Sequence, residues 1–273
     1  MCIIFIKTNP NPKKGELRLI IAANRDEFYR RPAREAYMCS ESEIIGGRDL
    51  HENREGGMWL GMKINREKET FKLGALLNVT GEDRNTDVHS RGFIVPGYLE
   101  SEESSIMYFE NFIKNKKFNA FNLVNVELSK KGISVYFLSN TPCQICEFPG
   151  EQTLGFGNSP VNRPLTKVQN GRMRFDEVTK NCESKEELRN NLIKFLKSNE
   201  KNLPDSELEW RAPQAFEYLS SIYVAMEQGY GTRTHTVVLV DDEWNIEFYE
   251  DTMESPIDAD NIVWKNKLLK SSL

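Results

Sequence analysis

Two apolar stretches near the start of the chain predict a β-hairpin. They cover residues 2–7 and 17–23, and the sequence between them, TNPNPKKGE, contains prolines and a glycine that favour a loop. The second strand would bring the polar residues 24–27, Asn-Arg-Asp-Glu, to the end of the hairpin. This end of the hairpin is therefore the first place at which polar chemistry is expected.

Similar stretches predict further strands and two helical regions. The strands are rich in Ile, Val, Leu and Phe without clean alternation, which indicates sheets that are covered on both faces. The second helical region has polar residues opposite its apolar ones at helical spacing. The expected strands are residues 58–64, 71–79, 121–128, 133–138, 152–157, 234–240 and 246–251, the helical regions are 90–114 and 165–200, and residues 202–213 are expected to form a loop.

Strands are thus expected towards both ends of the chain, with helices between them. We find no internal repeat, and no linker or change of composition that would separate domains. This organisation predicts one α+β domain over residues 1–273, with sheets stacked between helices rather than alternating βαβ units.

Composition and charge exclude several classes of function. The chain is 39% hydrophobic and 10% aromatic, which is ordinary for a soluble globular protein. Its net charge is −5 with both signs mixed along the chain, so no nucleic-acid partner is expected. The apolar start is too short for a secretory signal, and no stretch approaches the ~18 apolar residues of a membrane span. We therefore expect a cytoplasmic protein without a transmembrane segment.

The five cysteines are expected to be free thiols, because their number is odd and no secretory signal is visible. Cys143 and Cys146 form one C-x-x-C pair, and the prolines around it favour a strand or connecting segment over a metal or redox site. His51 and His89 lack the spacing of metal ligands. No metal centre is expected.

Cys2 raises a different question, because it follows the initiator Met1 directly. Removal of Met1 would leave a thiol and a free α-amine on one residue, and such a pair can be a catalytic nucleophile and its base. The alternative is a small buried residue at the start of a strand. The position of Cys2 at the start of an apolar stretch is compatible with both interpretations.

A catalytic Cys2 would need partners, and the sequence offers candidates at strand ends beside Gly or Pro. A carboxylate should hold the amine, a cation should favour the thiolate, and amide groups should meet the oxyanion formed when sulfur attacks a carbonyl. Arg25 and Asp26 end the hairpin, Asn78 lies in GALLNVTG, Asn158 in LGFGNSP, and Arg233 in GYGTRTHTVV.

Four sequence blocks, MCIIF, AANRDEF, GGMWLG and GYGTRT, resemble the NRDE family of transport and Golgi organisation proteins. The resemblance extends over the whole chain in the same order. It implies an N-terminal-nucleophile hydrolase fold, which is a four-layer αββα sandwich. The blocks LLNVTG, GNSP and TRT also look like those of cysteine-type penicillin and bile-salt amidases, to which the chain is more distantly similar.

Residue by residue, this resemblance implies that Cys2 matches the nucleophile and Asn78 an oxyanion donor. Asn158 matches the second amide, and Arg233 matches the cation beside the nucleophile. The amidases place an Arg and an Asp three residues apart at the hairpin end, whereas Arg25 and Asp26 of this chain are adjacent.

Adjacent side chains on a strand point to opposite faces, so Arg25 and Asp26 cannot both reach Cys2 unless the strand has ended. The pairs on one face would be Asn24 with Asp26, or Arg25 with Glu27. The amine-holding role within this block is therefore open.

Each candidate also has a structural interpretation. The residues 25–27 could form a turn or an ion-pair network, the two asparagines could cap turns, and Arg233 could pair with a carboxylate of the hairpin. His235 is expected to be a satisfied sheet residue. Trp59 is expected either to pack in the core or to line a pocket.

Two functions follow from these residues and from the resemblance. One is an amidohydrolase or thioesterase in which Cys2 attacks an acyl carbonyl and water releases the acyl group. The other, which the resemblance favours, is a factor in Golgi and endoplasmic-reticulum organisation and in mitochondrial lipid or haem homeostasis, associated with mitochondria or the Golgi.

In the second function the cleft would bind a small-molecule ligand, either acyl-CoA or haem, and no cofactor is required. Haem would need an axial ligand, for which Cys2, Met58 and His235 are candidates. Acyl-CoA would need basic residues beside an apolar slot, for which Arg25, Arg233 and Lys63 are candidates. Asn24, Glu27 and Trp59 complete the expected ligand-binding set.

Overall fold

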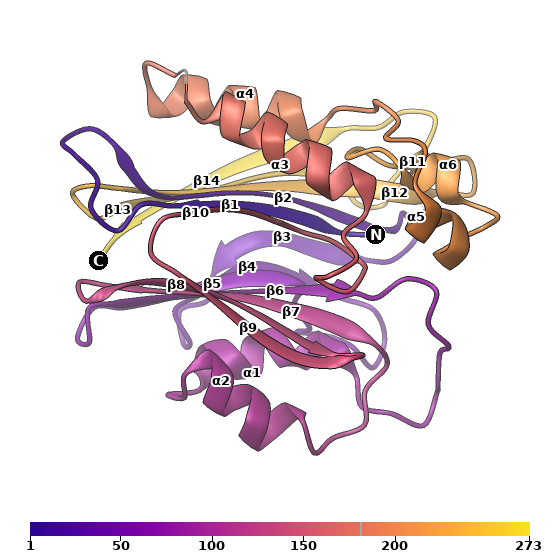
Figure 1. The fold of residues 1–273 in the computed structure, drawn as a ribbon, viewed down its shortest axis with the longest axis horizontal. Helices are drawn as coiled ribbons and strands as arrows, with labels where there is room; N and C mark the ends of the chain where they lie inside the picture. Colours follow the sequence, from indigo (N-terminus) through magenta and orange to yellow (C-terminus); the bar gives the residue numbers. More distant parts are fainter. Residues whose placement is uncertain (181) are drawn as a thin grey trace.

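Two large antiparallel sheets form the centre of the protein in a computed structural model, which describes residues 1–180 and 182–273 (Figure 1). Both ends of the chain contribute to the first sheet, because the N-terminal hairpin pairs with strands from the C-terminal part. Its strand order is β10 (Gln152–Phe156), β1 (Ile3–Thr8), β2 (Leu17–Phe28), β12 (Tyr230–Asp241), β13 (Asn245–Met253) and β14 (Trp264–Ser272), and the short β11 (Ala225–Met226) pairs with β12.

The second sheet is formed by consecutive strands, each paired with the next. Its order is β3 (Ala33–Met38), β4 (Ile44–Asp49), β5 (Leu60–Asn65), β6 (Thr70–Asn78), β7 (Phe121–Ser129), β8 (Gly132–Asn140) and β9 (Cys143–Pro149).

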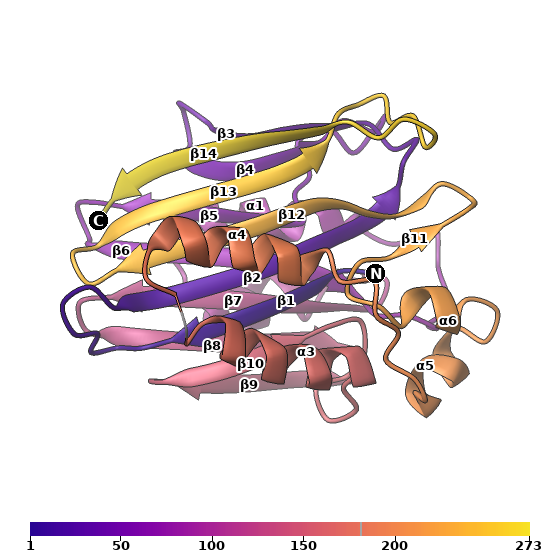
Figure 2. The ribbon, with the colours of Figure 1, turned by 90° about the horizontal axis from the view of Figure 1, so that it is seen from above.

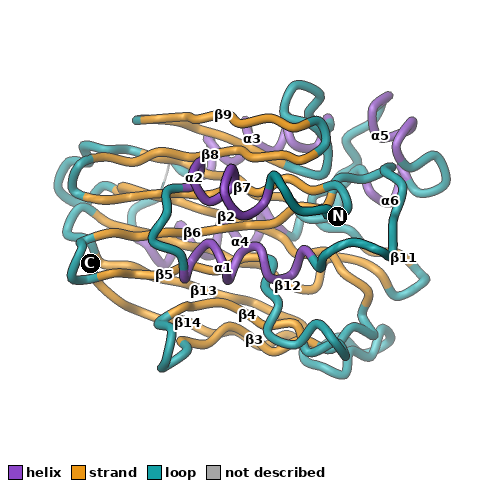
Figure 3. The backbone as a smooth tube through the Cα atoms, turned by 90° about the horizontal axis from the view of Figure 1, so that it is seen from below, coloured by secondary structure: helices purple, strands orange, loops and turns teal. Residues whose placement is uncertain are grey.

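Helices cover the outer face of each sheet, so that the layers run α, β, β, α (Figure 1). Helices α3 (Thr166–Val178) and α4 (Lys185–Leu196) lie across the first sheet (Figure 2). Helices α1 (Ile94–Glu100) and α2 (Ser105–Tyr108) lie across the second sheet (Figure 3). The remaining helical segments are the 3-10 turn η1 (Arg91–Phe93), the π-helical turn η2 (Phe109–Ile113), α5 (Ser206–Arg211) and α6 (Phe216–Leu219). The four-layer αββα arrangement predicted from the resemblance is confirmed.

Strand β2 shows why both faces of the first sheet are apolar. Successive side chains of a strand point to opposite faces. Leu19, Ile21 and Ala23 pack in the core between the two sheets, whereas Ile20 and Ala22 pack in a second core beneath α3 and α4. A third core lies between the second sheet and α1 with α2. The unbroken apolar sequence of the hairpin is thus explained by burial on two sides.

The predicted hairpin and central strands are confirmed, and the structure corrects several details. Strand β2 continues to Phe28, and β9 contains both cysteines of the C-x-x-C pair. The predicted helical region 90–114 is divided into four short segments, and 165–200 into α3 and α4, the latter capped by Ser184. The predicted loop 202–213 contains α5, which Asp205 caps. Within the described residues, no helix combines the length and apolar character needed to cross a membrane.

The topology gathers the predicted polar residues at one end of the sandwich. The β1–β2 ladder pairs Ile3 with Asn24, so the chain start lies beside the end of β2. Strand β12 begins next to the same end, and its ladder with β2 has a bulge between Thr232 and Thr234, at Arg233. The end of β6 contributes Asn78 from the second sheet. A site built here would therefore draw on both sheets.

Candidate functional site

A cavity of about 800 Å³ opens at this end of the two sheets. Cys2 from the chain start, Arg25 and Glu27 from β2, and Asn78 from β6 all line it. Arg233 of β12 lines it as well. Asp26 and Trp59 also line it, so the topology brings seven of the residues selected from the sequence to one cavity.

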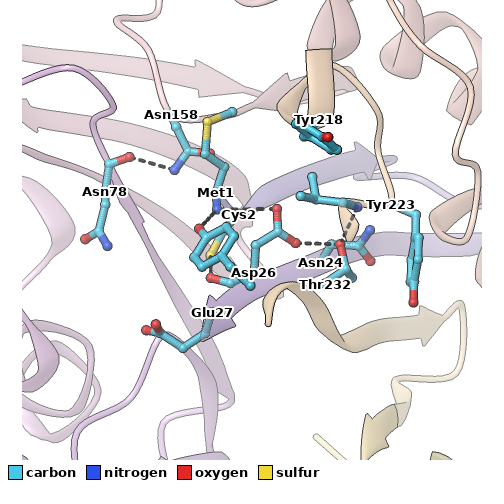
Figure 4. A network of polar contacts seen from close by, with 12 residues as sticks. Met1, Cys2, Asn24, Asp26, Glu27, Asn78, Asn158, Tyr218, Tyr223 and Thr232 are labelled. Atoms are coloured by element: carbon cyan, nitrogen blue, oxygen red, sulfur yellow. Dashed lines mark hydrogen bonds and ion pairs between the residues drawn. The ribbon is translucent and has the colours of Figure 1, made fainter. Parts of the chain in front are cut away.

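The amino terminus is buried beside this cavity. The Met1 amine lies 3.4 Å from Asp26 Oδ2 and donates a hydrogen bond to the Tyr230 hydroxyl (Figure 4). Thr232 Oγ1 donates to Asp26 Oδ1 at 2.6 Å. Burial raises the pKa of Asp26, and the positive charge of the amine opposes this shift. The carboxylate of Asp26 therefore anchors the start of the chain.

Cys2 lies at the boundary between the cavity and the core between the sheets. Its side chain is in the inter-sheet core, and the residue is 8% exposed. The Sγ atom lies 4.0 Å from the backbone oxygen of Asp26. Burial raises the pKa of the Cys2 thiol, while the nearby amine and Arg25 act in the opposite direction. The net effect is a raised pKa of the Cys2 thiol, which favours its protonated form.

Strand β2 does not end before Phe28, so the alternation of its side chains decides how the Asn-Arg-Asp-Glu block is used. Asp26 points to the amine, and Asn24 lies two residues earlier on the same face. Arg25 and Glu27 point to the other face, and all three residues 25–27 line the cavity. Arg25 and Asp26 therefore act on different sides of the strand, as adjacent residues of a continuing strand must.

The two predicted carboxamides have different positions. The side chain of Asn78 is exposed at the cavity, whereas Asn158 is 1% exposed and does not line it. Asn158 Nδ2 donates to the backbone oxygen of Asn78 at 2.6 Å (Figure 4). The Asn78 side chain is free to meet a ligand, while the Asn158 amide holds the backbone at the end of β6.

Arg233 is buried and engages the turn after β2. Its guanidinium donates to the backbone oxygens of Phe28 at 3.2 Å and Arg31 at 2.5 Å, and to Ser255 Oγ at 3.1 Å. Burial lowers the pKa of Arg233 to about 10. These three hydrogen bonds fix the wall of the cavity, and none of them is made to Cys2.

The ligand-binding candidates divide between the cavity and other places. Glu27 and Trp59 line the cavity, as does Met58. Lys63 lines a separate cavity of about 650 Å³. The structure therefore does not bring Lys63 together with Cys2, because it lies on β5 away from the chain start.

Asn24 and His235 lie on the helix-covered face of the first sheet. Asn24 Nδ2 donates to the backbone oxygens of Leu196 at 2.9 Å and Ile222 at 3.0 Å. Its Oδ1 lies 2.7 Å from His235 Nδ1. The His235 ring stacks on Trp264, and burial lowers its pKa to about 3. Neither residue lines the cavity. His235 is a sheet residue packed beneath α4, but it is not fully satisfied as expected, because its buried Nε2 has no hydrogen bond within the described residues.

Arginine is the feature of the cavity that the motifs did not predict. Eight arginines line it: Arg25, Arg31, Arg34, Arg48, Arg54, Arg84, Arg91 and Arg233. Arg31 pairs with Asp49 at 2.6 Å. Within residues 1–180 and 182–273, the side chains of Arg25, Arg54 and Arg84 have no ion pair or hydrogen bond. Arg54 and Arg84 lie in loops separated along the sequence, so only the fold brings them together.

Tyr230 and Thr232 are also site residues that sequence reasoning did not select. Both lie in the block GYGTRT, which was noted for its arginine alone. Tyr230 contacts the amine and Thr232 contacts Asp26. In the described part of the chain, no three His, Cys, Asp or Glu side chains are grouped to hold a metal ion.

Comparison with known proteins adds a family. A family model described as Transport and Golgi organisation 2 matches residues 1–255. Transport and Golgi organization protein 2 of Drosophila melanogaster is 40% identical over 263 residues, covering 93% of this chain and 92% of that protein. The homologues of Mus musculus and Homo sapiens are each 34% identical over 284 residues, covering 100% of this chain and 99% of theirs.

Among solved structures, the chain is similar to the Caenorhabditis elegans orthologue of N-acylethanolamine-hydrolyzing acid amidase. The identity is 12%, the TM-score is 0.48, and the match covers 87% of this chain and 92% of that one.

Proposed function

Because this chain belongs to the Transport and Golgi organisation 2 family, we propose that it serves transport and Golgi organisation by binding an anionic acyl ligand of the acyl-CoA class in the cavity beside Cys2. The observation that carries the proposal is the arginine-rich wall. The whole chain has a net charge of −5, whereas nine Arg and Lys residues line the cavity beside six Asp and Glu residues. Arginine pairs with phosphate through two parallel hydrogen bonds, so free guanidinium groups suit such a headgroup.

The same cavity offers an apolar surface for the acyl part. Met58, Trp59 and Leu76 line it together with Cys2. The arrangement suits a ligand with an anionic end at the arginines and an acyl carbonyl near Cys2.

Three observations favour binding over turnover. Burial favours the protonated Cys2 thiol, which is the less nucleophilic form. The Asn158 amide donates to Asn78, so only one of the two predicted carboxamides is exposed to the cavity. Arg233, which was expected to be the cation beside the nucleophile, donates to backbone oxygens of the β2–β3 turn and not to Cys2.

Calorimetric titration tests the binding proposal. Palmitoyl-CoA, CoA and palmitate are titrated into the wild-type protein and into a variant carrying Arg54→Gln and Arg84→Gln. We expect palmitoyl-CoA to bind most tightly and the double variant to lose at least tenfold in affinity for it. Lys63→Gln, in the other cavity, is the matched control and should retain wild-type affinity. Equal affinities of wild type and double variant would reject the proposal.

Haem is the alternative ligand, because its propionates would also suit the arginines. Of the three axial candidates, Cys2 and Met58 line the cavity, whereas His235 is buried elsewhere. Either sulfur would hold the iron as an axial ligand and set its spectrum. Titration with haem, followed by absorbance in wild type, Cys2→Ala and Met58→Leu, tests this ligand. A spectrum that neither substitution changes would reject sulfur ligation.

Hydrolysis is the second candidate function. The carboxylate of Asp26 favours it, because it holds the amine of Met1 at the start of the chain, next to Cys2. With Met1 removed, the Cys2 amine would take the thiol proton as sulfur bonds to the acyl carbon. The proton would then pass to the leaving thiol or amine, and water would release the acyl group as a carboxylic acid. Protein produced with Cys2 as its first residue should gain the acyl mass from palmitoyl-CoA on Cys2. Absence of both acylation and CoA release would reject turnover.

Acyl-CoA handling would connect the protein with lipid homeostasis at mitochondria or the Golgi. We expect a tagged protein to associate with one of these organelles, and depletion to change cellular acyl-CoA content. An unchanged acyl-CoA profile after complete depletion would contradict this cellular role.

A further inference from the structure

Lys167 is a lysine without any exposed surface in the first turn of α3. Its Nζ donates to the backbone oxygen of Ser221 at 3.1 Å. Within the described residues this is its one hydrogen bond, although an ammonium group has three donors. Burying an ammonium group is unfavourable unless an opposite charge compensates it. Burial lowers the pKa of Lys167, and the negative charge of Asp26 opposes this shift, so an ammonium group at this position depends on such a counter-charge.

The segment that receives Lys167 leads directly to Asp26. Ser221 accepts from Lys167, and the next residue, Ile222, accepts from Asn24 Nδ2 at 3.0 Å. The backbone N–H of Val224 donates to Thr232 Oγ1 at 2.9 Å, and Thr232 donates to Asp26. Residues 221–224 thus join the lysine on α3 to the two polar residues at the end of β2.

The carboxylate of Asp26 has one oxygen without a hydrogen bond within the described residues. Its Oδ1 accepts from Thr232, whereas its buried Oδ2 has no hydrogen bond and lies 3.4 Å from the Met1 amine. A fully buried carboxylate tends to take up a proton, and the positive charges of the amine and of Lys167 oppose this. The amine also donates a hydrogen bond to the Tyr230 hydroxyl.

We propose that Lys167 is a positioning residue of the cavity: its buried ammonium group is the second counter-charge of Asp26, keeps that carboxylate ionised, and so holds the chain start and Cys2 in place. Lys167 does not line the cavity, so it acts through Asp26 and not on a ligand. The inference is independent of the proposed function, because it concerns the anchor of Cys2 and not the ligand.

Other ionisable groups face the same cluster and must be considered in any titration. Cys2, Tyr29, Tyr223 and Tyr230 act electrostatically on Asp26 or are acted on by it. Asp205 faces Lys167 from the start of α5, but both of its oxygens accept backbone N–H groups. Of the two carboxylates that act on Lys167, only Asp26 has a buried oxygen without a hydrogen bond within the described residues.

Carbon-detected NMR of the aspartate carboxyl groups tests this assignment. The signal of Asp26, identified by its loss in Asp26→Asn, is titrated in wild type, Lys167→Met and Lys167→Arg. We expect Lys167→Met to shift the Asp26 titration upward by at least one pH unit, a tenfold change in its proton affinity. Lys167→Arg retains the charge and should shift it by less than half a unit.

The rate of Cys2 alkylation against pH gives the functional readout. At acid pH, protonation of Asp26 releases the chain start and changes this rate. The pH at which this change occurs should be higher in Lys167→Met than in wild type. It should be unaffected by the same substitution in an Asp26→Asn background. An unchanged Asp26 titration in folded Lys167→Met would overturn the proposal.

Should Lys167→Met fail to fold, the wild-type protein still decides the matter. Nitrogen-detected NMR of the Lys167 side chain must then show an ammonium group at pH 7. Its pKa must fall in Asp26→Asn. A neutral Lys167 amine at pH 7, or a pKa that does not respond to Asp26→Asn, would overturn the proposal equally.

Discussion

The side-chain amide of Asn158 donates to the backbone oxygen of Asn78 at 2.6 Å, across the gap between the two sheets. Asn158 follows β10 of the first sheet, and Asn78 ends β6 of the second. Thr80 N–H donates to the Asn158 backbone oxygen at 2.9 Å, so the two segments are joined twice. This link fixes the side chain of Asn78 at the cavity.

The link predicts different consequences for the two asparagines. Asn158→Ala leaves a buried carbonyl without its donor, so we expect the free energy of unfolding to fall by about 1–3 kcal/mol. Asn78→Ala removes only an exposed side chain and should change it by less than ~0.5 kcal/mol, while weakening ligand binding. Urea denaturation checks both. Equal losses of stability would show that Asn78 is also a structural residue.

Arg233 should act on stability through the turn after β2. Arg233→Met removes three hydrogen bonds from buried or partly buried groups, and we expect a loss of about 2–3 kcal/mol. Hydrogen exchange should increase between residues 28 and 31. The exposed neighbour Arg30, substituted by Gln, is the control and should change neither quantity. Wild-type exchange in Arg233→Met would mean that the turn is held by other contacts.

Glu250 predicts one component of the dependence of stability on pH. It accepts from the Ala36 backbone N–H at 2.6 Å, and burial raises its pKa to about 7. The folded state therefore binds the proton more tightly than the unfolded state. This contribution to stability is complete below about pH 4.5 and is lost as the pH rises through 7.

Glu250→Gln keeps the acceptor oxygen but does not ionise. Relative to wild type, its free energy of unfolding should increase from pH 4.5 to 7.5, by up to about 3 kcal/mol. Denaturation at several pH values gives the difference curve, with the exposed Glu67→Gln as control. A difference that does not vary with pH would contradict the raised pKa of Glu250.

His235 predicts the opposite trend, because burial beneath α4 lowers its pKa to about 3. The folded state binds this proton less tightly, so the contribution is present above about pH 6.5 and is lost as the pH falls towards 3. We expect His235→Gln to reduce the loss of stability between pH 6.5 and 5 by about 2 kcal/mol. The exposed His51→Gln should leave this loss unchanged. Identical acid slopes in wild type and His235→Gln would exclude this role.

Sequence patterns predicted the strands that are buried on both faces and the edge strand β10, but missed the edge strands β3 and β14. Strands β1, β2, β6 and β12 have long apolar runs because they contact two cores. Strand β14, with the sequence WKNKLLKSS, alternates with lysines because it is the outer strand of its sheet. Polar edge strands of this kind lack the signal on which sequence prediction depends.

Only those residues of the site that lie within local sequence motifs could be predicted. Of the residues selected at strand ends beside Gly or Pro, Arg25, Asp26, Asn78 and Arg233 line one cavity with Cys2, whereas Asn158 does not line it. The partner of the Asn158 amide depends on how two sheets approach each other, and this information is in no local pattern. Lys167 occupies a helical position that looks like part of a solvated face, and only tertiary packing buries it.

Ligand protection of Cys2 tests the central claim most directly. Iodoacetamide labelling is followed at each cysteine by peptide mass spectrometry, with and without palmitoyl-CoA. Cys143, which is exposed on the edge strand β9 and does not line the cavity, is the internal reference. We predict that palmitoyl-CoA slows labelling of Cys2 at least tenfold and leaves Cys143 unchanged. Equal labelling rates at Cys2 with and without saturating ligand would contradict a binding site beside this thiol.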